Sequence, residues 1–117
     1  MSNTKGKLAK DMTVNKKPFE NVFWAAKQGD VNLVRKMISE NPPLKTQVTP
    51  IRQRSLLIFA VLSQHLLVVK LLIQLSLDQS LKDTYGKIAK DYAEECLKSS
   101  KTKQEQVQAK NILSLLA

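Results

Sequence analysis

His65 and Cys96 are the side chains in this sequence best suited to chemistry, and each is the only residue of its type. A zinc site needs several His, Cys or carboxylate ligands at set spacings, which one histidine does not provide. Glu94 and Glu95 stand beside Cys96, and neighbouring carboxylates raise the pKa of a thiol, which argues against a nucleophile. The sequence also offers no Cys-His or Ser-His-Asp arrangement that its predicted elements would bring together.

Two further kinds of active site find no support in the sequence. The carboxylates of Asp91, Glu94 and Glu95 are more typical of a solvated helix face than of a catalytic pair. The three glycines stand far apart, so they form no Gly-rich loop that could hold a phosphate group. We therefore predict that the protein is not an enzyme and that it binds no cofactor and no metal ion.

The composition indicates one small globular domain. The chain has 117 residues, of which 43% are hydrophobic and 25% charged, both ordinary values. The longest apolar run, Leu56 to Val61, is far too short to span a membrane, and no apolar segment follows the N-terminal lysines as in a signal peptide. A single cysteine fits a reducing compartment. These features predict an intracellular, cytoplasmic protein.

The net charge of +9 is unevenly distributed. Residues 1–17 carry five lysines against Asp11, a net charge of +4, among few large apolar residues. We interpret them as a basic flexible leader that adds little to stability. The excess of lysine also leaves open an electrostatic surface for nucleic acid, anionic lipid or an acidic protein.

Apolar spacing predicts six short helices in three pairs. Phe19 to Gln28 and Val31 to Glu40 form the first pair, separated by Gly29, which ends one helix, and Asp30, which can cap the next. The prolines after Asn41 stop the second helix. The four later helices are expected over Leu56–Ser63, Leu66–Leu75, Lys87–Leu97 and Lys103–Leu116, with Ser55 as a cap.

The first two pairs have related sequences. Ala25 corresponds to Ala60 and Val34 to Val69, both at an offset of 35 residues. A third unit places Ala93 33 residues after Ala60. A period in the low thirties indicates stacked helical repeats, in which each unit buries its apolar face against its neighbours.

These units resemble the ankyrin repeat. The segment 83–93, Asp-Thr-Tyr-Gly-Lys-Ile-Ala-Lys-Asp-Tyr-Ala, is similar to the turn and first helix of that family. Residues 25–31 and 60–66 are similar to its helix junction, and residues 34–38 and 69–73 to its second helix. The resemblance implies an all-α, ankyrin-like helical solenoid over residues 18–117, with finger loops and repeats at about 18–47, 48–80 and 81–117.

The sequence also departs from the family pattern. No unit has the usual Thr-Pro pair, and the third unit carries extra residues around Ser99. The middle unit has Gln53 where the turn glycine is expected and Pro50 where the aspartate is expected, so its finger should deviate from the usual tight turn. The signature of the tetratricopeptide repeat, which has a similar period, is absent.

The resemblance implies protein–protein interaction through the concave face and the finger loops. The basic residues there favour a partner protein with an acidic surface, and Arg and Tyr are typical interface anchors. The positions implied as partner-binding are Lys16, Lys17, Lys27, Gln28, Ile51, Arg52, Arg54, Leu62, Ser63, Thr84, Tyr85 and Lys87.

Four of the larger side chains have roles implied by their repeat positions. His65 matches the junction histidine, whose expected role is a hydrogen bond to the backbone of a neighbouring unit. Trp24 and Phe59 are expected to pack between units. Tyr85 lies at a finger tip, where it is expected to be exposed.

Two alternative functions remain open at this point. A basic protein of this kind could bind nucleic acid or an anionic membrane through the leader lysines. It could also be a microbial effector that acts on a host protein, which the Lys- and Asn-rich composition permits. The sequence leaves the oligomeric state undetermined.

Overall fold

The computed structural model describes residues 18–116 and is all-helical over that range. It contains six α-helices, one 3-10 helix and no strand among the described residues, apart from an isolated antiparallel bridge between Val48 and Ser55. The α-helices are α2 (Pro18–Gln28), α3 (Val31–Glu40), α4 (Leu56–Leu62), α5 (Leu66–Gln74), α6 (Ala89–Ser99) and α7 (Lys103–Leu115). The prediction of an all-α fold is therefore confirmed.

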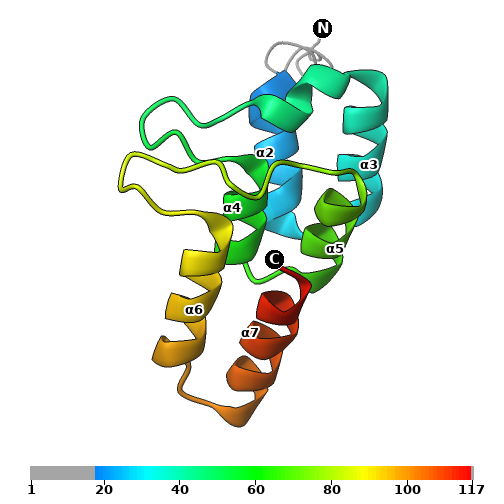
Figure 1. Ribbon diagram of the computed structural model, residues 1–117. Helices are drawn as coiled ribbons and strands as arrows, with labels where there is room; N and C mark the ends of the chain where they lie inside the picture. Colours follow the sequence, from blue (N-terminus) through cyan, green and yellow to red (C-terminus); the bar gives the residue numbers. More distant parts are fainter. Residues whose placement is uncertain (1–17, 117) are drawn as a thin grey trace, which may run out of the picture.

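The helices are arranged as three pairs in two rows (Figure 1). α2 packs on α3, α4 on α5, and α6 on α7. Within one row α4 contacts both α2 and α6, and within the other α5 contacts both α3 and α7. The loops that precede α4 and α6 project together from one side of this arrangement (Figure 1). The middle pair is thus covered on two sides by helices.

Polar side chains fix the beginnings of several helices, as the sequence indicated. Asp30 caps α3, where its Oδ1 accepts a hydrogen bond from the Leu33 amide at 3.1 Å. Ser55 caps α4, where its Oγ accepts from the Ile58 amide at 3.1 Å. Each cap satisfies an amide that has no partner within its own helix. Both predicted caps are confirmed.

The clearest differences from the predicted elements are the start of α6 and the segment after α3. α6 begins at Ala89 and not at Lys87, because Lys87 belongs to the preceding turn, where its carbonyl accepts from the Asp83 amide at 3.0 Å. Residues expected to form a loop after α3 instead form the 3-10 helix η1 (Pro42–Thr46). Proline is compatible with a helix start, since its missing amide would be unpaired there in any case.

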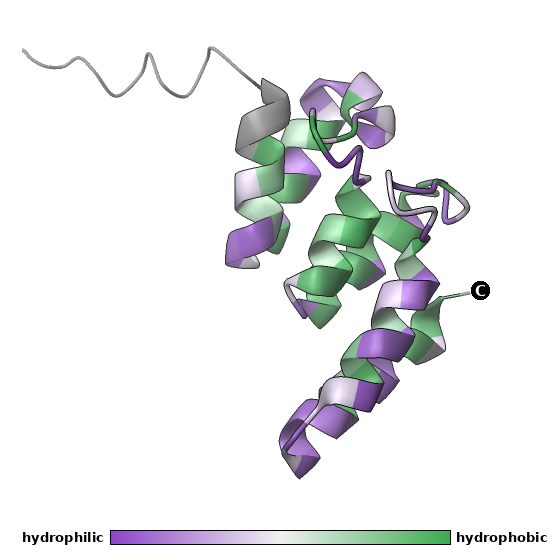
Figure 2. Cartoon of the chain, turned by 90° about the vertical axis from the view of Figure 1, so that its left-hand side faces the viewer, coloured by the Kyte–Doolittle hydropathy of each residue, from purple (hydrophilic) through white to green (hydrophobic). Residues whose placement is uncertain are grey.

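The core is centred on the middle pair. Five of the seven residues of α4 are buried, and α5 adds Val68, Val69, Leu71 and Leu72. Hydropathy follows this arrangement, because α4 is hydrophobic along most of its length while much of α6 and α7 is hydrophilic (Figure 2). A helix that is apolar all round needs neighbours on several faces, and the central position provides them.

His65 ties the first two units together at their junctions. Its Nε2 donates a hydrogen bond to the Lys27 carbonyl at 2.8 Å, which confirms the predicted backbone contact. Gly29 lies directly against the ring, and a Cβ at that position would come within 2.7 Å of His65 Nδ1. Gly29 also has a φ of +79°, so both its backbone and its surroundings require glycine.

Candidate partner-binding surface

The loops that precede α4 and α6, called the finger loops below, are joined to each other at their tips. The Thr84 amide donates to the Arg52 carbonyl at 2.9 Å. The Arg52 guanidinium carbon lies 5.9 Å from the centre of the Tyr85 ring, within range of a cation–π contact. Ile51 is 84% exposed and Tyr85 59% exposed. We refer to Ile51, Arg52, Thr84 and Tyr85 as the finger-tip cluster.

Asp83 organises the third unit's finger. Its Oδ1 accepts hydrogen bonds from the amides of Tyr85 at 2.9 Å and of Lys87 at 3.2 Å. The Gly86 amide donates to the Asp83 carbonyl at 2.9 Å, and Gly86 has a φ of +74°. This carboxylate closes a tight turn and thereby fixes the backbone on which Tyr85 is carried.

The middle unit's finger closes in a different way, as its sequence predicted. The Gln53 amide donates a hydrogen bond to the Thr49 carbonyl at 3.0 Å. This turn is one residue longer than the equivalent turn, which the Gly86 amide closes on the Asp83 carbonyl. Thr49 Oγ1 accepts a hydrogen bond from the Arg54 amide at 3.0 Å. In the next unit the corresponding bond, from the Lys87 amide, is accepted by Asp83. Gln53 has a φ of +54°, an unfavourable value for a residue with a side chain.

Arg54 makes its side-chain contacts within the structure. Its Nε lies 3.5 Å from Asp83 Oδ2 and one of its terminal nitrogens lies 3.4 Å from the Tyr92 hydroxyl. The Tyr92 hydroxyl in turn donates to Asp83. The Arg54 guanidinium also lies 5.3 Å from the centre of the Tyr92 ring. This side chain therefore fastens the middle finger to the third unit, a role that the sequence analysis missed.

The Asp83 carboxylate is buried but charged. Burial alone would raise its pKa, but hydrogen bonds from Tyr92, from the backbone amides of Lys87 and Tyr85, and from Arg54 outweigh that effect, and the pKa lies below its usual value. Burial, together with the hydrogen bond to Asp83, raises the pKa of Tyr92. Asp83 and Arg54 thus form a pair of one negative and one positive charge at neutral pH.

Lys87 is also engaged within the chain. Its Nζ lies 2.5 Å from Glu95 Oε2 and 5.4 Å from the centre of the Tyr92 ring. The hydrogen bond to Glu95 raises the pKa of Lys87. Its charge is therefore partly neutralised within the chain, which leaves Arg52 as the more available cation of the fingers.

The first helices of the first two pairs, α2 and α4, contribute fewer exposed groups to this surface than the sequence suggested. Lys27 and Gln28 are exposed, whereas Leu62 and Ser63 are half-buried, with Leu62 packed against the core. Lys16 and Lys17, and the leader that contains them, lie outside the described residues.

The aromatic residues of the first helices divide into one confirmed and one wrong prediction. Phe59 packs between units, with its ring 5.3 Å from that of Phe23 in an edge-to-face contact. Trp24, which was expected to do the same, is 59% exposed, so that prediction is wrong. Trp24 belongs to the first unit, and no described helix lies on its far side to cover it.

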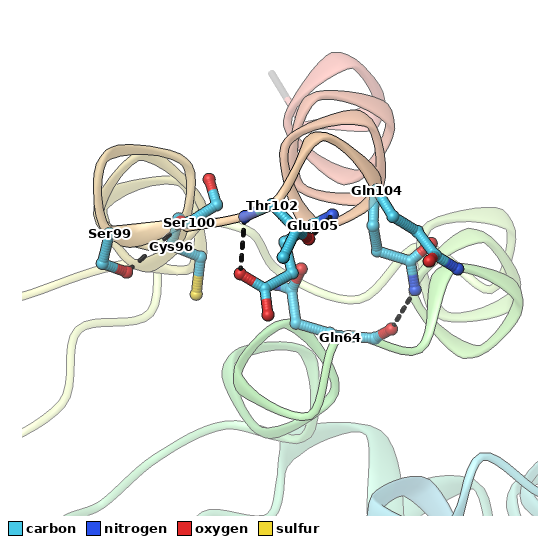
Figure 3. A pocket seen from close by; sticks show the side chains of 8 residues that line it. Gln64, Cys96, Ser99, Ser100, Thr102, Gln104 and Glu105 are labelled. Atoms are coloured by element: carbon cyan, nitrogen blue, oxygen red, sulfur yellow. Dashed lines mark hydrogen bonds between the residues drawn. The ribbon is translucent and has the colours of Figure 1, made fainter.

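A groove of about 680 Å³ lies where the ends of α4 and α6 approach the first turns of α7 (Figure 3). Its polar side chains already make hydrogen bonds within the chain, such as those from Gln108 Nε2 to the Gln64 carbonyl at 2.6 Å and from the Lys101 amide to Glu105 at 2.8 Å. The lining residues are Gln64, Cys96, Ser99, Ser100, Thr102, Gln104, Glu105 and Gln108.

The one thiol that lines this groove belongs to Cys96. Burial and the neighbouring Glu95 raise the pKa of the Cys96 thiol, which keeps it protonated and weakly nucleophilic at neutral pH. Within residues 18–116 no group of three or more His, Cys, Asp or Glu side chains could hold a metal ion. None of the helices described here has the length and apolar character needed to cross a membrane.

Comparison of the chain with protein-family models, with curated proteins and with solved structures finds no match.

Proposed function

We propose that this protein is an ankyrin-type interaction module that binds a partner protein through its finger-tip cluster and the adjoining concave face. The observation that carries the proposal is the finger-tip cluster itself. An exposed isoleucine, an arginine and a tyrosine from two separate loops are held together by the backbone bond between Thr84 and Arg52. Arg and Tyr are enriched at the centres of interfaces, and their fixed placement lowers the entropy lost on binding.

The ankyrin assignment is supported by several features together. Related segments recur at offsets of 35 and 33 residues. Successive helix pairs contact each other in two rows, and the loops between pairs project together from one side. His65 makes a bond between units at the position where the family has its junction histidine. Surfaces built from adjacent loops of stacked units are suited to binding other macromolecules.

The charge of this surface favours an acidic partner. Arg52, Lys82 and Lys27 are exposed cations, and none of them is in an ion pair among the described residues. Arg54 and Lys87, by contrast, are held by Asp83 and Glu95. We therefore assign the recognition of carboxylates mainly to Arg52, with Tyr85 and Ile51 supplying apolar contact area.

The proposal is tested by capturing partners from cell lysate on the immobilised protein. The double variant Arg52→Ala/Tyr85→Ala should lower the affinity of a captured partner by about 30-fold or more, equivalent to about 2 kcal/mol. The matched control is Lys36→Ala, because Lys36 is an exposed cation on α3, in the second row of helices. If Lys36→Ala weakens binding more than the double variant does, the finger-tip proposal is wrong.

The alternative of nucleic-acid or anionic-membrane binding is favoured by a different surface. The second row of helices carries exposed cations on α3, α5 and α7, namely Arg35, Lys36, Lys70, Lys103 and Lys110. Binding to phosphate groups weakens steeply as salt rises, whereas an interface with apolar anchors weakens less. Titration of a labelled single-stranded DNA and of anionic vesicles at two salt concentrations distinguishes these modes, and a strongly salt-dependent affinity would favour the alternative.

A further inference from the structure

The helices of the second row each carry an exposed cation at the same place. Val34, Val69 and Ala109 are buried on α3, α5 and α7. Each of them is followed directly by an exposed basic residue, namely Arg35, Lys70 and Lys110. The steps between these cations are 35 and 40 residues, and the second step includes the extra residues around Ser99. Packed helices lie roughly 10 Å apart, so each unit adds one positive charge beside the last.

Carboxylates do little to neutralise this row. Lys36 on α3 and Lys103 on α7 are exposed as well, and we call these two and the three cations above the basic face. None of the five is in an ion pair with another residue of 18–116. The exposed acids of the same helices are Glu40 and Glu105, and Glu105 Oε1 already accepts from the Lys101 amide at 2.8 Å. The basic face therefore keeps a positive potential that attracts an anionic surface.

Two exposed apolar side chains lie beside these cations. Leu67 is 63% exposed and Val107 is 50% exposed. Leu67 precedes Lys70 by three residues, and Val107 precedes Lys110 by three residues, so each pair shares one side of its helix. The two helices that carry these pairs, α5 and α7, contact each other. The basic face thus combines positive charge with exposed apolar area on neighbouring helices.

We propose that the basic face docks on the surface of a membrane that contains anionic lipids. Its cations match the negative charge of such a surface, where each lysine or arginine strengthens binding about fivefold. Leu67 and Val107 enter the boundary between headgroups and acyl chains, as the apolar residues of interfacial helices do. Nucleic acid fits this face less well, because α3, α5 and α7 contain no Phe, Tyr or Trp on which bases stack.

Membrane docking goes beyond the proposed function, because it uses a second surface. In Figure 1 the tips of the finger loops lie on the left of the molecule and the second row of helices on the right. A protein docked through the basic face therefore keeps its finger-tip cluster available to a partner in solution. The two proposals fail separately, since partner binding is measured with finger-tip variants and docking with variants of the basic face.

Co-sedimentation of the full chain with lipid vesicles tests this docking. The anionic vesicles contain phosphatidylcholine and phosphatidylserine in a ratio of about seven to three, and vesicles of phosphatidylcholine alone are the neutral comparison. Lys70→Gln/Lys110→Gln should weaken binding to the anionic vesicles by about 30-fold. The matched control Lys82→Gln/Lys98→Gln removes the same charge from a finger loop and from α6, and it should bind as the unmodified chain does. The lysines of residues 1–17 are present in every variant, so they do not affect this comparison.

The apolar pair distinguishes a membrane from nucleic acid. Leu67→Ser/Val107→Ser should weaken binding to the anionic vesicles by about fivefold or more, because it removes apolar area that enters the interface. Binding of the same variant to a short DNA duplex should not change, and its circular dichroism should match that of the unmodified chain, since both side chains are exposed.

Two results would overturn the proposal. One is binding to the anionic vesicles that is no stronger than to the neutral ones, or that Lys70→Gln/Lys110→Gln weakens no more than the control does. The other is tighter binding to the duplex than to the anionic vesicles, with no effect of Leu67→Ser/Val107→Ser on either, because the basic face would then be a nucleic-acid surface.

Discussion

Single backbone positions decide how closely the units approach one another. The junction of the first unit has Gly29 with a positive φ, and the junction of the second has Gln64 with a φ of +59°. Gly29 is pressed against the His65 ring, whereas Gly86, with a φ of +74°, has no atom within 4 Å of the place where a Cβ would stand. The two glycines therefore share a conformation but differ in their surroundings.

We expect Gly29→Ala to destabilise the protein more than Gly86→Ala does. Both substitutions carry the cost of placing a side chain at positive φ, about 1 kcal/mol. Gly29→Ala must in addition displace His65 and strain its bond to Lys27. Urea unfolding of both variants measures the difference. Equal losses of unfolding free energy would show that His65 gives way at no cost and that the junction contact is unimportant.

Asp83 should make stability depend on pH in the acid range. Its pKa in the folded protein is lower than the value of 3.8 for a free side chain. The unfolded chain therefore takes up the proton first as pH falls, so this contribution is complete above about pH 4 and is lost as pH falls through the folded pKa. Asp83→Asn should lower the Tm clearly at pH 7, and the difference from the unmodified chain should shrink below pH 4.

Asp78→Asn is the control for this pH dependence. Asp78 also has a lowered pKa, owing to hydrogen bonds from Ser80, but it is exposed and its hydrogen bonds are to this neighbouring residue. We expect its removal to change the Tm little at any pH. A larger effect for Asp78→Asn than for Asp83→Asn would contradict the role of Asp83 in joining the fingers to α6.

At the scale of elements, small residues set the spacing between first helices. Ala60 lies on α4 with no exposed surface, and α4 contacts both α2 and α6. We expect Ala60→Leu to overpack this contact and to cost roughly 1–3 kcal/mol, seen as a lower Tm by circular dichroism.

The matched control for the packing experiment is Gln74→Leu. Gln74 is exposed near the end of α5, so the same side chain has room there. Its effect should stay within about 0.5 kcal/mol, as is usual for exposed positions. An Ala60→Leu variant as stable as the Gln74→Leu variant would mean that α4 does not need a small side chain at this point.

At the scale of the whole molecule, the middle pair depends on both neighbours. α6 covers α4, and α7 covers α5. A chain that ends at Lys82 lacks α6 and α7, and buried residues of α4 and α5 are then exposed to water. We expect this chain to lose the cooperative thermal transition of the full protein, because each unit of a stacked array is stabilised by its neighbours. A sharp transition at an unchanged Tm would show that the first two pairs form an independent domain.

Much of the fold could be predicted from the sequence because its determinants are local. Apolar residues at helical spacing, together with Asp30, Ser55 and the prolines after α3, place most of the helices within one or two residues of their observed bounds. The resemblance to the ankyrin repeat implied that His65 contacts the backbone of a neighbouring unit, and the bond to Lys27 confirms that contact. A repeat encodes its own contacts, since equivalent positions meet equivalent neighbours.

The availability of individual side chains was decided by tertiary contacts. Arg54 and Arg52 looked alike in the sequence, but only Arg54 lies beside Asp83 and Tyr92, residues 29 and 38 positions away. Trp24 and Phe59 looked alike as well, but only Phe59 has another unit before it in the described structure. Helix periodicity states which face of an element is apolar, whereas exposure and pairing depend on what the rest of the chain places against that face.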